Sequence, residues 1–304
     1  MPDATAQPVF STAQYRKFAL AAAVLTLGFV VPLWKLVSFA VADELHSYIP
    51  LMPLVSGYLV WTQKARRPHC STPARKLAAL FFAAGLAAIA GYFAVSRFAT
   101  PATVANTLVL STLAWLLFLT AAGCWFLGGA MMRTLAFPFF LLVFMLPFPA
   151  VLRDGIEAGL QHGSAAVADW MFTLSGTPML RDNMLFRLPG ISLKVAPECS
   201  GIHSTLVLFI TSLVAGQMIL RSPWNRAWLC LAVLPLALVR NGFRVFVLGE
   251  LCVHVGPEML DSPIHHHGGP LFFVLSLAPF FLLLYFLRKT EQTGAAGEAP
   301  NSKK

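Results

Sequence analysis

Long apolar runs, separated by short polar connections, account for most of the chain. The hydrocarbon core of a bilayer is about 30 Å thick, so a membrane helix needs roughly 20 mostly apolar residues. One run is shorter and contains proline, which favours a tilted or partly re-entrant segment (47–62). We predict about eight transmembrane helices, at residues 18–41, 47–62, 77–99, 103–127, 134–152, 201–220, 227–252 and 269–287.

Composition supports a membrane protein over a soluble one. Hydrophobic residues form 57% of the chain and charged residues 12%, whereas a soluble domain carries about 25% charged residues. We therefore predict an all-α polytopic protein that forms a single integral membrane domain over residues 1–304, embedded from about 18 to 287. The first apolar run is too long for a signal-peptide core and lacks a small-residue cleavage site, so no cleavable signal peptide is expected.

The distribution of charge predicts the orientation. Cytoplasmic connections of membrane proteins are enriched in Lys and Arg, which explains the net charge of +9 better than nucleic-acid binding does. With the N-terminus inside, 14 of 22 basic residues are cytoplasmic, but only 3 of 13 acidic residues are (Asp3, Glu291 and Glu298). An odd number of helices would spoil this separation. Eight helices with cytoplasmic tails at 1–16 and 288–304 fit it.

One large external segment, 153–200, is expected to have structure of its own. Its first half has apolar residues at helical spacing with polar residues between them, which is typical of a helix lying in the membrane interface. Its second half has two short alternating runs on either side of Pro189-Gly190, which predicts a small β-hairpin at the membrane surface.

Candidate chemistry begins with the cysteines. Five occur, at a spacing that matches neither a zinc site nor a disulfide framework. Cys199 stands where the external segment meets the next helix, and a helix N-terminus favours thiolate over thiol. Ser200 is the expected N-cap. A plain structural role, or a disulfide with Cys252, is the alternative for Cys199.

Two arginines lie far along the next helix. If that helix starts inside near Arg226, Arg244 lies about 27 Å along it, close to the outer interface. Arg240 is one turn deeper on the same face, and Asn241 is three residues from Arg244. Charged side chains this far into an apolar span tend to face a polar cavity, although arginines near a helix end often extend to the headgroups instead.

A histidine triplet, His265-His266-His267, lies in the external connection before the last helix. Its ordinary interpretation is a solvated loop or an adventitious metal site. The topology, which was derived without these residues, brings the triplet, Cys199 and Arg244 to one face of the membrane.

Three motifs then resemble the exosortase/archaeosortase family. Pro-Glu-Cys-Ser-Gly-Ile (197–202) resembles its active-site cysteine motif, in which Cys-Ser-Gly opens a membrane helix. Asn-Gly-Phe-Arg (241–244) is similar to its Asn-x-x-Arg motif. His265, followed after four residues by Gly269 and then by Phe272-Phe273, is similar to its histidine motif.

The likeness covers roughly residues 44–287, because two upstream stretches also resemble family segments (46–61 and 144–149). The chain departs from the family at His203, where relatives often carry Arg. The triplet also leaves His266 as an alternative to His265.

The resemblance implies a cysteine peptidase or transpeptidase in the bacterial inner membrane. Its partners would be exported proteins with a C-terminal tag, which consists of a short motif such as Pro-Glu-Pro, one transmembrane helix and a basic end. Cys199 would form a thioester, Arg244 would stabilise the thiolate or the oxyanion, and His265 would carry the proton. Ser200, Gly201, Arg240, Asn241 and His266 would support them. No metal or cofactor is expected, and the acceptor nucleophile is open.

Two other classes of function remain. A metalloprotease could use His254 with the triplet, but His-Glu-x-x-His is absent, and three consecutive histidines rarely bind one ion together. A non-enzymatic transporter or assembly factor could use Arg240 and Arg244 as an anion site.

Overall fold

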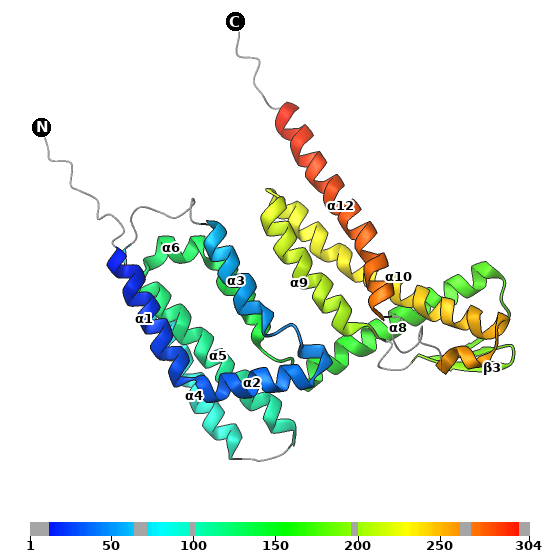
Figure 1. Ribbon diagram of the computed structural model, residues 1–304, viewed down its shortest axis with the longest axis horizontal. Coiled ribbons are helices and arrows are strands. Elements are labelled where there is room, and N and C mark those ends of the chain that lie inside the picture. The colour runs from blue at the N-terminus through cyan, green and yellow to red at the C-terminus, as the bar shows by residue number, and fades with distance from the viewer. Residues whose placement is uncertain (1–11, 64–71, 98–100, 196–199, 262–268, 298–304) are drawn as a thin grey trace, which may run out of the picture. The chain divides into compact units, whose positions relative to one another are not determined.

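The computed structural model (Figure 1) describes residues 12–63, 72–97, 101–195, 200–261 and 269–297. The chain divides into two compact units, Met1–Leu152 and Arg153–Lys304. Each unit is described by itself.

The first unit is entirely helical in its described residues. Helices α1 (Thr12–Gly28) and α2 (Val30–Ala42) replace the predicted continuous segment 18–41 and meet at a bend of 70°. Pro32 explains the break, because its ring excludes the carbonyl four residues earlier, at Gly28. A second bend of 66° separates α6 (Gly128–Thr134) from α7 (Ala136–Leu141) and η3 (Leu142–Met145). Pro138 has the same relation to Thr134.

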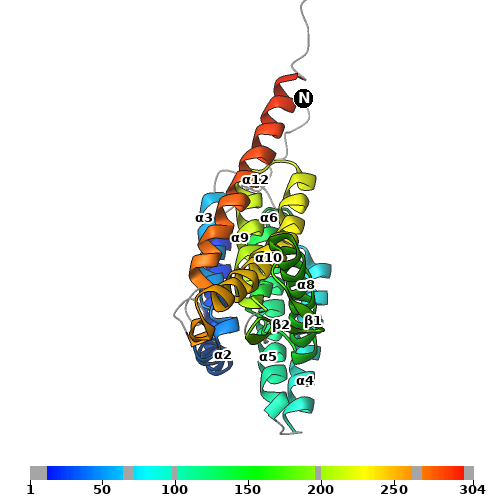
Figure 2. The same cartoon turned by 90° about the vertical axis from the view of Figure 1, so that its right-hand side faces the viewer.

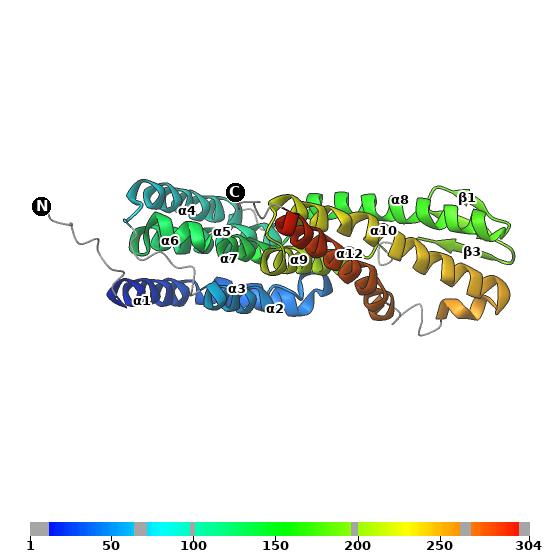
Figure 3. The same cartoon turned by 90° about the horizontal axis from the view of Figure 1, so that it is seen from above.

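Helices α4 (Arg75–Ser96) and α5 (Pro101–Phe126) form the long pair of this unit and lie side by side in Figures 1 and 3. Glycine permits their close contact, because a Cβ on Gly85 would come within 3.0 Å of the Phe118 ring. Between α2 and α3 (Leu51–Thr62) lies the one-turn helix η1 (Glu44–His46).

A buried histidine fastens two segments of this unit together. The His46 side chain is 3% exposed, and its Nδ1 lies 2.9 Å from Asp43 Oδ2. Its Nε2 accepts a hydrogen bond of 3.2 Å from the Phe148 backbone N–H. Because Nε2 is an acceptor, the proton must be on Nδ1, where it is donated to Asp43. The imidazole is therefore held as one neutral tautomer.

The second unit begins with the long helix α8 (Ala150–Ser175), whose first residues belong to the unit before it. Strands β1 (Leu180–Asp182), β2 (Leu185–Leu188) and β3 (Ile191–Lys194) follow and form an antiparallel sheet in the order β1-β2-β3. The predicted helix and hairpin are confirmed as elements. The first strand was missed. Asp182 pairs with Leu185, so the turn between β1 and β2 is Asn183-Met184, and Asn183 there has a positive φ of 57°, a conformation that asparagine adopts more readily than most residues.

Three more long helices complete this unit: α9 (Ile202–Ile219), α10 (Pro223–His254) and α12 (Gly269–Gly297), with the short η5 (Pro257–Asp261) between the last two. Figure 1 shows α9 beside the first half of α10, while α8 and the sheet lie along its second half, as Figures 2 and 3 also show. Glycines again permit the contact, because a Cβ on Gly242 would come within 3.0 Å of the Ser164 carbonyl of α8.

The protein is a multi-pass membrane protein, but the predicted count of eight spans is not confirmed. Among the described residues, five helices are long and apolar enough to cross a bilayer, and the number of spans rises to seven if each bent pair is one span. Segment 47–62 falls short because its helix, α3, has only 12 residues, about 18 Å at 1.5 Å per residue.

Candidate active site

The turn before α9 has an unusual backbone. Gly201 occupies the N-cap with a left-handed φ of 65°, which a residue with a Cβ adopts only at a cost. The sequence predicted Ser200 as the N-cap, but the N-cap is Gly201. The Ser200 hydroxyl still accepts a hydrogen bond of 3.4 Å from the Ile202 N–H. Cys199 itself lies outside the described residues.

Two adjacent residues of α10 hold this turn. The Asn241 side-chain amide donates to the Ser200 carbonyl. The Arg240 Nη2 donates to the Gly201 carbonyl at 3.4 Å and to the Thr205 hydroxyl at 3.3 Å. The Arg240 Nε also donates to Asn241 Oδ1 at 3.2 Å. Both carbonyls of the turn are thus bound by α10.

Arg240 is buried, with 7% of its surface exposed, so it does not extend to the headgroups. Its Nη1 has no hydrogen-bond partner among the described residues, and within that part of the chain no carboxylate pairs with its guanidinium. A buried charge without a counter-ion is costly in an apolar span. Arg244 lies one turn further along the same face and is partly buried.

The start of α12 lies beside the same part of α10. The ring of Phe272, which is 6% exposed, lies 6.1 Å from that of Phe243, the neighbour of Arg244. His265 and His266 come shortly before α12 and, with the rest of the triplet, lie outside the described residues. The elements that carry the cysteine motif and the histidine motif therefore both meet α10 between residues 240 and 244.

The sheet is fixed to the same helix by an apolar cluster. Phe186, Leu188 and Leu193 pack with Phe172 of α8 and with a set of α10 residues, Val245, Leu248 and Cys252. Cys252 is a free thiol within this cluster, so the alternative of a disulfide with Cys199 is wrong. The chain leaves the cluster at Val195, four residues before Cys199.

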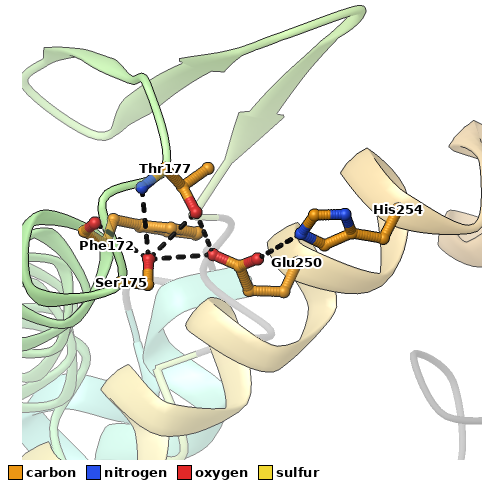
Figure 4. Close-up of polar contacts among 5 residues, drawn as sticks. All are labelled: Phe172, Ser175, Thr177, Glu250 and His254. Atoms are coloured by element: carbon orange, nitrogen blue, oxygen red, sulfur yellow. Dashed lines mark hydrogen bonds and ion pairs between the residues drawn. The ribbon is translucent and has the colours of Figure 1, made fainter.

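A polar group lies beyond this cluster (Figure 4). From the sequence, His254 was considered as a metal ligand, and the other members of the group were not considered. Glu250 of α10 accepts hydrogen bonds from the hydroxyls of Ser175, at 3.1 Å, and Thr177, and its other oxygen lies 3.1 Å from His254 Nε2. The pair of Glu250 and His254, four residues apart on one helix, could have been found from its spacing. The hydroxyls come from far along the sequence and carried no such signal.

Comparison with known proteins adds one match. Residues 40–282 match the family model of the transmembrane exosortases, and this stretch is 243 of the 304 residues. No curated protein sequence and no solved structure matches the chain. The matched stretch contains the Cys199, Arg244 and His265 motifs and the upstream segments around His46 and Phe148. The chain belongs to the transmembrane exosortase family.

Proposed function

We propose that this exosortase is a cysteine peptidase or transpeptidase that cleaves exported proteins at a C-terminal sorting tag. The observation that carries the proposal is that the start of α9 and the start of α12 both contact the same part of α10, residues 240 to 244. The Ser200–Gly201 turn contacts Arg240 and Asn241, and the start of α12 contacts Phe243. The proposed nucleophile, cation and histidine belong to these three elements.

Cys199 is the proposed nucleophile because it directly precedes the Ser200–Gly201 turn at the start of α9. Its thiolate sulfur attacks the scissile carbonyl carbon and forms a tetrahedral intermediate. When the C–N bond breaks, a thioester joins the exported protein to Cys199, and the amine leaves with the tag. An acceptor, either an amine, a hydroxyl or water, then attacks the thioester, transfers its proton to the histidine that protonated the leaving amine, and releases the thiolate.

Arg244 is the proposed electrostatic catalyst. A guanidinium does not lose its proton in proteins, so it suits stabilisation of the thiolate and of the oxyanion better than proton transfer. His265, or His266 in its place, donates the proton that the leaving amine requires, because imidazole changes its protonation near neutral pH. Each step balances without a metal or an organic cofactor.

The proposed location of this chemistry is the outer face of the bacterial inner membrane. The unequal partition of basic and acidic residues supports cytoplasmic termini and an external sheet. An exported substrate would present its tag on that side, with the basic end of the tag at the cytoplasmic face.

Replacement of Cys199 by alanine tests the function. We expect a tagged exported protein to accumulate uncleaved in cells that carry Cys199→Ala, as judged by its size on an immunoblot. Cys230→Ala is the matched control, since the Cys230 sulfur accepts a hydrogen bond of 3.4 Å from Ser212 within the α9–α10 pair and has no role in the proposal. Normal cleavage in the Cys199 variant would favour a non-enzymatic assembly factor.

A further inference from the structure

We propose that Asn241 and Arg240 are positioning residues for Cys199, acting through the left-handed turn at Ser200–Gly201. This inference rests on the proposed function, because it assigns these residues a task in presenting the nucleophile. Arg240 would then affect the reactivity of Cys199 as well as the packing of α9 against α10.

The two carbonyls of the turn are held in place by α10. The Ser200–Gly201 and Gly201–Ile202 peptides can rotate only if the Ser200 carbonyl leaves Asn241 and the Gly201 carbonyl leaves Arg240. The Gly201 carbonyl also accepts from the Thr205 N–H at 2.9 Å and from the Thr205 hydroxyl at 2.8 Å. These donors come from α9 and α10 together, so the direction in which the chain enters α9 is fixed by two helices.

Asn241 and Gly201 are also matched in shape. A Cβ on Gly201 would come within 2.7 Å of Asn241 Cγ, and Asn241 is only 4% exposed. The asparagine therefore packs directly against the glycine backbone. A larger side chain at 241 would push the turn away, and a smaller one would leave the Ser200 carbonyl without its donor.

Arg240 also brings a positive charge to this turn. Arg240 places a buried guanidinium at the first turn of α9, where in the described part of the chain only carbonyl, hydroxyl and amide oxygens accept its hydrogen bonds. Its positive charge adds to the positive end of the α9 dipole. A cation within a few ångströms favours the charged form of a neighbouring thiol. The same contacts thus orient Cys199 and favour its thiolate.

The other end of α9 provides a matched comparison. Arg226 of α10 donates from Nε and Nη2 to the Leu220 carbonyl, at 3.1 and 2.8 Å, and from Nη1 to Gln217. Arg226 and Arg240 therefore bind the two ends of one helix from one partner helix. Of the two arginines, Arg240 contacts the turn that directly follows Cys199 in the sequence, so loss of Arg226 should affect folding without affecting the thiol.

The experiment measures the reactivity of Cys199 directly. In full-length protein whose other cysteines are replaced by alanine, the rate of alkylation by iodoacetamide is followed against pH. We expect Asn241→Asp and Arg240→Met to move the midpoint of this profile upward by roughly one to three pH units, and to slow tag cleavage by up to roughly 100-fold. Arg240→Lys, which keeps a charge and a donor, should restore the midpoint in part, and Arg226→Met should leave it unchanged.

The outcomes separate this inference from the proposed function. An unchanged midpoint in Asn241→Asp and Arg240→Met, or an equal shift in Arg226→Met, would overturn the positioning role even if Cys199 is catalytic. A shifted midpoint together with normal cleavage in Cys199→Ala would support the contact and remove the catalytic proposal. Should Arg240→Met fail to fold, Asn241→Asp gives the same comparison, because it preserves most of the side-chain volume.

Discussion

A single methyl group added at Gly201 should have two separable effects. A non-glycine residue in the left-handed conformation costs about 1–2 kcal/mol. The new Cβ would also displace Asn241, whose hydrogen bonds to Ser200 and Arg240 contribute about 1 kcal/mol each. We therefore expect Gly201→Ala to lower the free energy of unfolding by roughly 3–4 kcal/mol.

Gly190 is the control, because its φ is 78° and a Cβ there would meet no atom within 4 Å. Gly190→Ala should therefore lose only the backbone contribution, about 1–2 kcal/mol. The assay is unfolding of the purified protein by titration with sodium dodecyl sulfate in mixed micelles, with tag cleavage as a second measurement.

The Asn241 contact also predicts that a second substitution recovers part of the lost unfolding free energy. In a double-mutant cycle, Asn241→Ala should make Gly201→Ala less costly, because the methyl group then has space. Equal losses for Gly201→Ala and Gly190→Ala, with no recovery in the double variant, would refute the reasoning that Asn241 requires a glycine at this turn.

Two further predictions concern polar groups away from the turn. Glu250→Ala should remove the acceptor for Ser175 and Thr177, and we expect faster amide hydrogen exchange in the peptide 176–183, corresponding to a local loss of about 1–2 kcal/mol. His254→Ala, which loses only an exposed pair, should change this exchange little, and equal exchange in both variants would contradict the role of Glu250. His46→Leu should remove the hydrogen bonds of the Phe148 N–H and of Asp43 Oδ2 and lower the unfolding free energy by about 1–3 kcal/mol for each group. His162→Leu is its control, since His162 is exposed and, among the described residues, bonds to the Ala158 carbonyl of its own helix. Comparable unfolding of the two histidine variants would argue against the His46 contacts.

Local sequence signals predicted several elements closely. The apolar run 201–220 became α9 at Ile202–Ile219, and Pro189-Gly190 became the turn between β2 and β3. The bends were not predicted. Pro32 and Pro138 are the sole sequence signals for them, and proline alone does not predict a bend, because prolines also occur inside α10 and α12 without ending these helices.

For the site, the sequence identified Arg240 and Asn241 but not their contacts. Arg240 near an apolar helix end predicts either a buried contact or extension to the headgroups. The choice depends on the register of α10 against α9, whose contacting residues are 35 to 41 positions apart in the chain. Periodicity within one helix carries no information on this register.

The length of α10 sets a scale for substrates. Its 32 residues correspond to about 48 Å at 1.5 Å per residue, against about 30 Å of hydrocarbon. Arg240 and Arg244 lie 17 and 21 residues beyond Pro223, at about 26 and 32 Å. In the proposed orientation, with Pro223 at the cytoplasmic face, these two positions lie on either side of the outer boundary of the hydrocarbon. The length of the substrate's own membrane segment would therefore determine whether its scissile bond lies level with these arginines. A segment several residues too short would hold the scissile bond below Arg244, and one too long would carry it past the site, so hydrophobic matching would itself select what is cleaved.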